Sequence, residues 1–133
     1  MRVLALDYGS ARCGCAISDP TGTLARPLAA LEPPDPGAVA RLVADSDAER
    51  VVVGLPLSLS GEDSAQTRLS REFAAELGDL LDVPVETYDE RLTTTMANRT
   101  AREGASADPD SLAAAHLLES YLERQAAPGG GAA

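Results

Sequence analysis

The chain has no tryptophan and no lysine, and only two of its 133 residues are cysteine. Because aromatic residues make up 3% of the chain, a buried core has to be built from leucine, valine and alanine. No apolar run approaches the roughly 20 residues of a membrane-spanning helix, and no basic and apolar leader precedes the first strand-like run. We therefore expect a cytoplasmic protein without a membrane partner, with one domain over residues 1–125 and a disordered tail over 126–133.

The two cysteines, Cys13 and Cys15, lie two residues apart in a strand-like run, so both side chains face the same side. Neighbours placed in this way are poorly set to form a disulfide with each other. Without a second Cys or His pair, the C-x-C spacing is also a weak metal signal. We interpret both residues as small, buried apolar side chains.

The formal net charge of −10 argues at first against a nucleic-acid partner. However, the acidic residues are concentrated between residues 31 and 90, and acids and bases nearly balance outside that region. Every basic residue is arginine, whose planar guanidinium suits phosphate groups. The segment from Arg91 to Arg102 contains three arginines and no acid. A nucleic-acid partner therefore stays open, with the acidic middle of the chain facing away from it.

The hydrophobic pattern predicts an α/β fold with the element order β-β-β-α-β-α-β-α-α. Short turns join the first three strands, which we expect to pair antiparallel, whereas the later strands alternate with helices and should be parallel. Pro27 favours an edge position for the third strand. The prediction is a five-stranded mixed sheet flanked by helices. The predicted strands cover residues 2–7, 12–18, 23–31, 50–56 and 83–90, and the predicted helices 37–46, 64–82, 93–103 and 108–125.

The clearest predicted helix, over 64–82, has large apolar residues at helical spacing. Its expected buried face consists of Leu69, Phe73, Leu77 and the Leu80–Leu81 pair. The last predicted helix has Asp108 as its N-cap and Pro109 as its first residue.

Three acidic residues are expected at one edge of this sheet. Asp7 ends the first predicted strand, Glu90 ends the last one, and Asp110 lies in the first turn of the final helix. Ligands of open α/β sheets bind outside the carboxyl ends of the parallel strands. Three acids that converge without a basic side chain repel one another, and oxygen ligands favour Mg²⁺ or Mn²⁺ between them. Such an ion binds a phosphodiester and activates water.

Each acid also has a structural interpretation. Asp7 can cap the turn that follows it, Glu90 can be a solvated strand end, and Asp110 can stabilise the N-terminus of its helix. Spacing alone does not decide, and the functional interpretation needs all three acids. Asp89 is interpreted as a solvated or outer acid on the opposite face from Glu90. His116, the only histidine, lies among alanine and leucine and is interpreted as structural or exposed.

Four blocks of the sequence, in this order, resemble the YqgF-type proteins, a family of pre-16S ribosomal RNA nucleases and Holliday-junction-resolvase-like proteins. The blocks are LALDYGSARCGCAISD, VVVGLP, TYDERLTT and DSLAAAHLLESYL, and they extend from residue 4 to residue 122. The resemblance implies a fold of the RNase H-like superfamily and a metal-dependent nuclease. Ala11 departs from the family, because many members have lysine there, and so does Ser58, where asparagine is common.

The resemblance assigns the catalytic and metal-binding roles to three acids and substrate contacts to the residues around them. It implies that Arg91 and Thr93 help to position the nucleic-acid backbone or support the site, and Arg12 matches an arginine of the family. Arg99 is either a phosphate contact or a residue of the helix surface. The catalytic and metal-binding candidates are therefore Asp7, Glu90 and Asp110, and the substrate-binding candidates are Arg12, Arg91, Thr93 and Arg99.

The leading hypothesis is a nuclease that hydrolyses RNA with Mg²⁺ or Mn²⁺, in the processing of ribosomal RNA precursors. One alternative is a resolvase of four-way DNA junctions, which needs two sites and hence a homodimer. A second is an RNA-binding assembly factor without catalysis. A third class, the actin-like and sugar-kinase folds, shares the strand followed by D-x-G but needs two such domains, whereas the length of this chain suits one.

Overall fold

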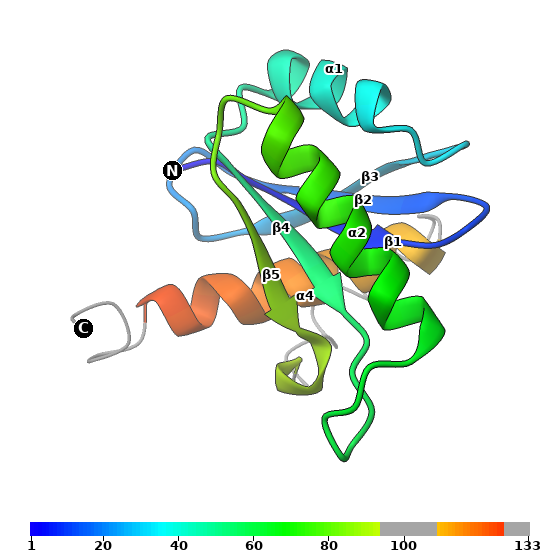
Figure 1. Ribbon diagram of the computed structural model, residues 1–133. Coiled ribbons are helices and arrows are strands. Elements are labelled where there is room, and N and C mark those ends of the chain that lie inside the picture. Colours follow the sequence, from blue (N-terminus) through cyan, green and yellow to red (C-terminus); the bar gives the residue numbers. More distant parts are fainter. Residues whose placement is uncertain (94–108, 127–133) are drawn as a thin grey trace.

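The structure is a computed structural model that describes residues 1–93 and 109–126. Within these residues it forms one five-stranded sheet in the order β3-β2-β1-β4-β5, with helices on both faces (Figure 1). Three expectations concern residues outside those described. They are the helix over 93–103 with Arg99, of which only Thr93 is described, the N-cap at Asp108, and the tail from residue 127. The strands are β1 Val3–Tyr8, β2 Cys13–Ser18, β3 Ala25–Leu31, β4 Arg50–Leu55 and β5 Val85–Asp89, and the helices are α1 Pro36–Ser46, α2 Ala65–Leu80, the 3-10 turn η1 Glu90–Leu92 and α4 Pro109–Ala126.

The pairing confirms the predicted mixed sheet. β1 pairs antiparallel with β2, and β2 with β3, whereas β1–β4 and β4–β5 are parallel. The β2–β3 turn is fixed by the carboxylate of Asp19, which accepts the backbone N–H groups of Thr23 and Leu24, both at 2.8 Å. Gly22 supplies the positive φ of 73° that this turn requires. The third strand lies at the edge of the sheet, where the proline at position 27 costs no ladder hydrogen bond.

Alternate residues of each strand face different helices. The helices α1 and α2 cover one face of the sheet, and α4 crosses the other (Figure 1). Leu4 and Leu6 belong to the core under α1 and α2, whereas Val3 and Ala5 belong to the core under α4. By the same alternation, Asp7 faces the α4 side. This face carries the candidate site.

The packing face of α2 differs from the expected one. Phe73 and Leu77 are buried as predicted, but Leu69 is 41% exposed and Leu80 is 52% exposed, so the prediction is wrong for these two residues. The face is completed instead by small side chains, among them the buried Thr67, whose hydroxyl donates to the carbonyl of Pro56 at 2.9 Å. Burial of a hydrogen-bonded threonine at the helix start turns the two leucines toward solvent.

Two further expectations concern burial. Cys13 and Cys15 are both free thiols with no exposed surface, which confirms their interpretation as small core residues. In the part of the chain that the structure describes, no helix has the length and apolar character to cross a membrane.

Candidate active site at the carboxyl end of β1

Asp7 lies near the end of the central strand, between two glycines. On one side, β2 places Gly14 directly opposite Asp7. On the other side, the parallel pairing of Leu6 with Val53 brings Gly54 alongside. Both glycines lie on the same face of the sheet as the Asp7 side chain. Because glycine has no side chain, the neighbouring strands place none on either side of the Asp7 carboxylate. The space that they leave is used by Asp110 and Glu90.

Gly14 allows the first turn of α4 to lie directly on β2. A Cβ atom at Gly14 would be 2.0 Å from the carbonyl oxygen of Asp110, a distance that only glycine permits. The contact is fastened by the Ser111 hydroxyl, which accepts the backbone N–H of Cys15 at 3.2 Å. The backbone of Asp110 is thereby fixed beside the strand position opposite Asp7.

Gly54 makes the corresponding room for Glu90. A Cβ atom at Gly54 would be 2.7 Å from Glu90 Oε2 and 3.0 Å from Leu117 Cδ1. The last strand ends at Asp89, so Glu90 begins η1 instead of ending the strand, and the predicted boundary is wrong by one residue. The Asp89 carboxylate caps this turn, because it accepts the backbone N–H of Arg91 at 2.9 Å. The turn bends Glu90 back over β4.

Burial and mutual repulsion disfavour the charged forms of two of the acids. The pKa of Asp7 rises to about 6, mainly through burial and then through the charge of Asp110. The pKa of Glu90 rises to about 7, through burial and then the charges of Asp7 and Asp89. Asp7 and Glu90 share a pocket of about 140 Å³ with Thr93, Ala113, His116 and Leu117. A cation in this pocket would relieve both penalties.

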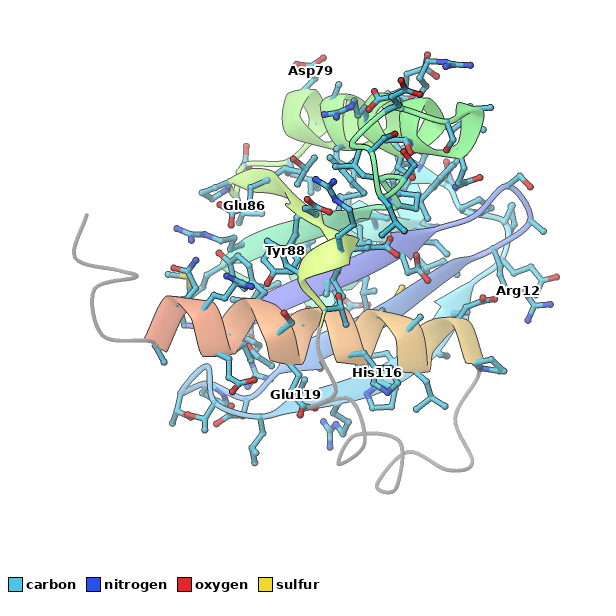
Figure 2. All side chains as sticks on the ribbon, turned by 90° about the horizontal axis from the view of Figure 1, so that it is seen from below. Arg12, Asp79, Glu86, Tyr88, His116 and Glu119 are labelled. Atoms are coloured by element: carbon cyan, nitrogen blue, oxygen red, sulfur yellow. The ribbon has the colours of Figure 1, made fainter. Side chains whose placement is uncertain are left out.

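Asp110 has a different environment. Its Oδ2 atom is 3.4 Å from Nε of Arg12, and Figure 2 shows Arg12 beyond the N-terminal end of α4. The expectation that the three acids converge without a basic side chain is therefore wrong. Within residues 1–93 and 109–126, no group of three His, Cys, Asp or Glu side chains is arranged to hold one metal ion. The structure brings Asp7 and Glu90 into one pocket, whose lining does not include Asp110, although the charge of Asp110 acts on Asp7.

The donor set nevertheless fits a hard divalent cation. Both pocket acids offer carboxylate oxygens, which Mg²⁺ and Mn²⁺ prefer. Burial and then the neighbouring carboxylates raise the pKa values of both acids, so a cation bound there would favour their charged forms. The pocket volume corresponds to several water molecules, at ~30 Å³ each.

Arg91 forms part of the scaffold around this pocket. Its guanidinium donates to the Asp89 carboxylate at 2.7 to 3.0 Å and to the carbonyls of Ser58 and Leu59 at 3.3 and 3.4 Å. It thus ties the loop after β4 to η1. The hydrogen bonds from Arg91 keep the pKa of Asp89 below its usual value.

Sequence reasoning missed His116 as a pocket residue. It lines the same pocket as Asp7 and Glu90, and its Nε2 atom is buried without a hydrogen-bond partner among the described residues. Burial lowers its pKa and so favours the neutral imidazole. Figure 2 shows His116 in the middle of α4. The sequence signal that could have indicated this position of His116 is the three-residue spacing along the helix from Asp110 through Ala113 to His116.

The sheet order and the position of the acids define a class of protein. The Thermus thermophilus RuvC structure has a TM-score of 0.62 with this chain at 15% identity, covering 92% of this chain and 95% of that chain. T. thermophilus RuvC in complex with a Holliday junction substrate gives a TM-score of 0.61, again at 15% identity, over 92% and 94% of the two chains. These likenesses show an RNase H-like fold, as predicted.

The family follows from closer relatives. Residues 1–124 match the model of the RuvX family, described as Holliday junction resolvase. A pre-16S rRNA nuclease by name, from Rubrobacter xylanophilus, is 42% identical over 98% of this chain and 96% of its own length. A relative of the same name from Koribacter versatilis is 40% identical over 93% of this chain and 88% of its own. The chain belongs to the RuvX family and is a nuclease, a hydrolase that acts on phosphodiester bonds of nucleic acid. The fold and the family imply dependence on a divalent metal ion.

Proposed function

We propose that this protein hydrolyses phosphodiester bonds in RNA, in the processing of ribosomal RNA precursors, with Mg²⁺ or Mn²⁺ held by Asp7, Glu90 and Asp110. The observation that carries the proposal is the pocket that Asp7, near the end of β1, shares with Glu90, the first residue of η1, where burial and then the charge of Asp7 raise the pKa of Glu90 to about 7. The names of the curated relatives support RNA as the substrate. The proposal places the enzyme in the cytoplasm and treats residues 1–125 as one catalytic domain.

The chain's own residues set up the reaction. Asp7 lies on a strand paired on both sides, so its carboxylate has a rigid base. With a pKa of about 7, Glu90 is partly protonated near neutral pH in the metal-free protein, and a bound cation would favour its carboxylate form. A divalent ion held by these acids would offset phosphate charge and activate water for attack. Thr93 lines the pocket, and Arg91 holds the neighbouring loop beside it.

The test compares substrates and one matched pair of variants. Single-stranded RNA, structured precursor RNA and four-way DNA junctions are offered to the wild type with Mg²⁺ or Mn²⁺. Asp7→Asn should lose at least about 100-fold in cleavage rate, because it removes a cation ligand on the rigid strand. Asp79→Asn removes a carboxylate from α2, on the far side of the sheet (Figure 2), and should keep the wild-type rate. Cleavage by Asp7→Asn at saturating Mn²⁺ would contradict the proposal, as would RNA binding without any cleavage by the wild type.

A second candidate is the resolution of four-way DNA junctions. It is favoured by the family description and by the likeness to a RuvC structure that holds such a substrate. Junction resolution needs two sites on symmetric strands and therefore a homodimer. Faster cleavage of junctions than of RNA, together with a dimer mass in solution, would select this candidate; a monomer that cleaves RNA would exclude it.

A further inference from the structure

The Arg12–Asp110 ion pair lies close enough to the pocket for the charge of Asp110 to act on Asp7, and it joins two residues whose backbones are held in place. The turn between β1 and β2 is closed by the N–H of Gly9, which donates to the Arg12 carbonyl at 3.0 Å. Asp110 is held against Gly14 by the close backbone contact described above. Only rotation of the two side chains can therefore change where the Asp110 carboxylate points.

The ion pair is also well placed to be exchanged. The Arg12 and Asp110 side chains are 44% and 48% exposed, and the Nε–Oδ2 distance of 3.4 Å is longer than a strong charge-assisted hydrogen bond. A phosphate group binds guanidinium through two parallel hydrogen bonds and can compete with the Asp110 carboxylate for Arg12. Water reaches both partners, so the exchange does not require the core to open.

We propose that Arg12 is a positioning residue that keeps Asp110 out of the cation site until a phosphate of the nucleic acid takes the guanidinium. Released in this way, the Asp110 carboxylate turns toward Asp7 and Glu90 and completes a set of three. Cation and nucleic acid then bind cooperatively, and each raises the affinity for the other by the same factor. The inference rests on the proposed function, because it needs a cation at these acids.

The first experiment measures Mn²⁺ affinity of metal-free protein by calorimetric titration, without substrate. Arg12→Ala should bind Mn²⁺ about two- to five-fold more tightly than the wild type, the range expected for loss of a half-exposed ion pair. Arg12→Gln, which keeps most of the side-chain length, should do the same. The control is Arg26→Ala, which removes an equal charge from an exposed position on β3 and should leave the affinity unchanged.

The second experiment asks whether the effect passes through Asp110. In an Asp110→Asn background, Arg12→Ala should no longer change the Mn²⁺ affinity, because the carboxylate that Arg12 restrains is absent. An unchanged gain in that background would mean that Arg12 acts by general charge, and would overturn the inference. Weaker Mn²⁺ binding by both Arg12 variants would overturn it as well, since Arg12 would then support the site.

The third experiment adds a cleavage-resistant strand, a short 2′-O-methyl RNA with phosphorothioate linkages. It should tighten Mn²⁺ binding by the wild type by a factor similar to that of Arg12→Ala, and should have no such effect on the variant. A wild type that binds no Mn²⁺ in any of these titrations would refute the proposed function itself. A wild type that binds Mn²⁺ with the affinity of Arg12→Ala would refute only the role of Arg12.

Discussion

The two faces of the sheet are built by alternate residues of the same strands, yet they are packed in opposite ways. Under α1 and α2 the strands β1 and β4 present large branched side chains, which belong to one buried core. Toward α4 the strands present alanine and glycine near the end of β1, and the space is occupied by a helix backbone and by carboxylates. The contrasted positions are Leu4, Leu6, Val51 and Val53 on the first face and Ala5, Gly14, Ala16 and Gly54 on the second. The room for the site therefore comes from strand positions that carry glycine or alanine instead of a large side chain.

The α4 face itself changes across the sheet. On β5 it is a closed core, in which the ring of Tyr88, the register partner of Gly54, packs edge to face with Tyr121 at 5.7 Å and the Tyr88 hydroxyl bonds to that of Ser120 at 2.8 Å. The two glycines lie on β2 and β4, on either side of β1. The closed half of the face fixes α4 in place, and the open half uses that fixed helix to present Asp110.

The largest effect is expected from adding one methyl group to the open face, by which we mean the α4 face of the sheet around Gly14 and Gly54. Gly14→Ala should lower the free energy of unfolding by more than about 3 kcal/mol and abolish Mn²⁺ binding, because the new Cβ collides with rigid backbone of α4. Urea unfolding and calorimetry measure the two effects.

The matched control for this variant is Gly78→Ala in α2, where an added Cβ meets no atom within 4 Å. It should stabilise the protein by about 0.5–1 kcal/mol, since alanine favours a helix over glycine. If Gly14→Ala unfolds like the wild type and binds Mn²⁺ normally, the close approach of α4 to β2 has no role.

The closed face should respond to the opposite change. Leu6→Ala removes a fully buried side chain from the α1–α2 side and should cost about 3 kcal/mol of stability. Below the unfolding transition, the variant should keep the wild-type Mn²⁺ affinity, because its neighbours on the other face are unchanged. A loss of affinity in fully folded protein would show that the two faces are coupled.

The acids of the open face should give the metal-free protein a distinctive pH dependence. Asp7 and Glu90 have pKa values raised to about 6 and 7 in the folded state, so the folded state binds more protons than the unfolded state between about pH 4 and 7. Their contribution therefore favours folding at low pH and is lost as the pH rises through 6 and 7. The loss amounts to roughly 1–2 kcal/mol for these partly exposed groups.

Difference measurements isolate this contribution from the repulsion of the whole acidic chain. Melting curves of the wild type and of the Asp7→Asn/Glu90→Gln variant should converge near pH 4, and the variant should be more stable at pH 8. Saturating Mn²⁺ should raise the wild-type stability at pH 8 and leave the variant unchanged. A stability difference that does not depend on pH would contradict the raised pKa values.

The sequence was sufficient for the strands and for the place of two acids, because both depend on local patterns. Apolar runs and short turns predicted the five strands and the edge position of β3, and the end of β1 fixed Asp7. The buried face of α2 was mispredicted at Leu69 and Leu80, because helical spacing shows which residues align and does not show that Thr67 finds a buried carbonyl.

The rest of the site depends on contacts between distant segments. The role of Gly54 depends on the parallel pairing of β1 with β4, which brings Gly54 beside Asp7 and which no local pattern encodes. The ion pair of Arg12 with Asp110 joins the start of β2 to the last helix, and His116 enters the pocket through the position of α4. The assignment of Asp7, Glu90 and Asp110 to one cation stays a prediction.

The finest test of the comparison is the second glycine of the open face. At Gly54 an added Cβ meets the far end of the Glu90 side chain, which can move, whereas at Gly14 it meets backbone. Gly54→Ala should therefore cost only about 1 kcal/mol of stability but should push the Glu90 carboxylate away from Asp7, lowering Mn²⁺ affinity about 10-fold. The pKa of Glu90, followed by NMR, should fall in the variant as its repulsion by Asp7 weakens. Strong destabilisation with unchanged Mn²⁺ affinity would mean that Gly54 serves the packing of Leu117 rather than the position of Glu90, and that one glycine alone opens this face of the sheet.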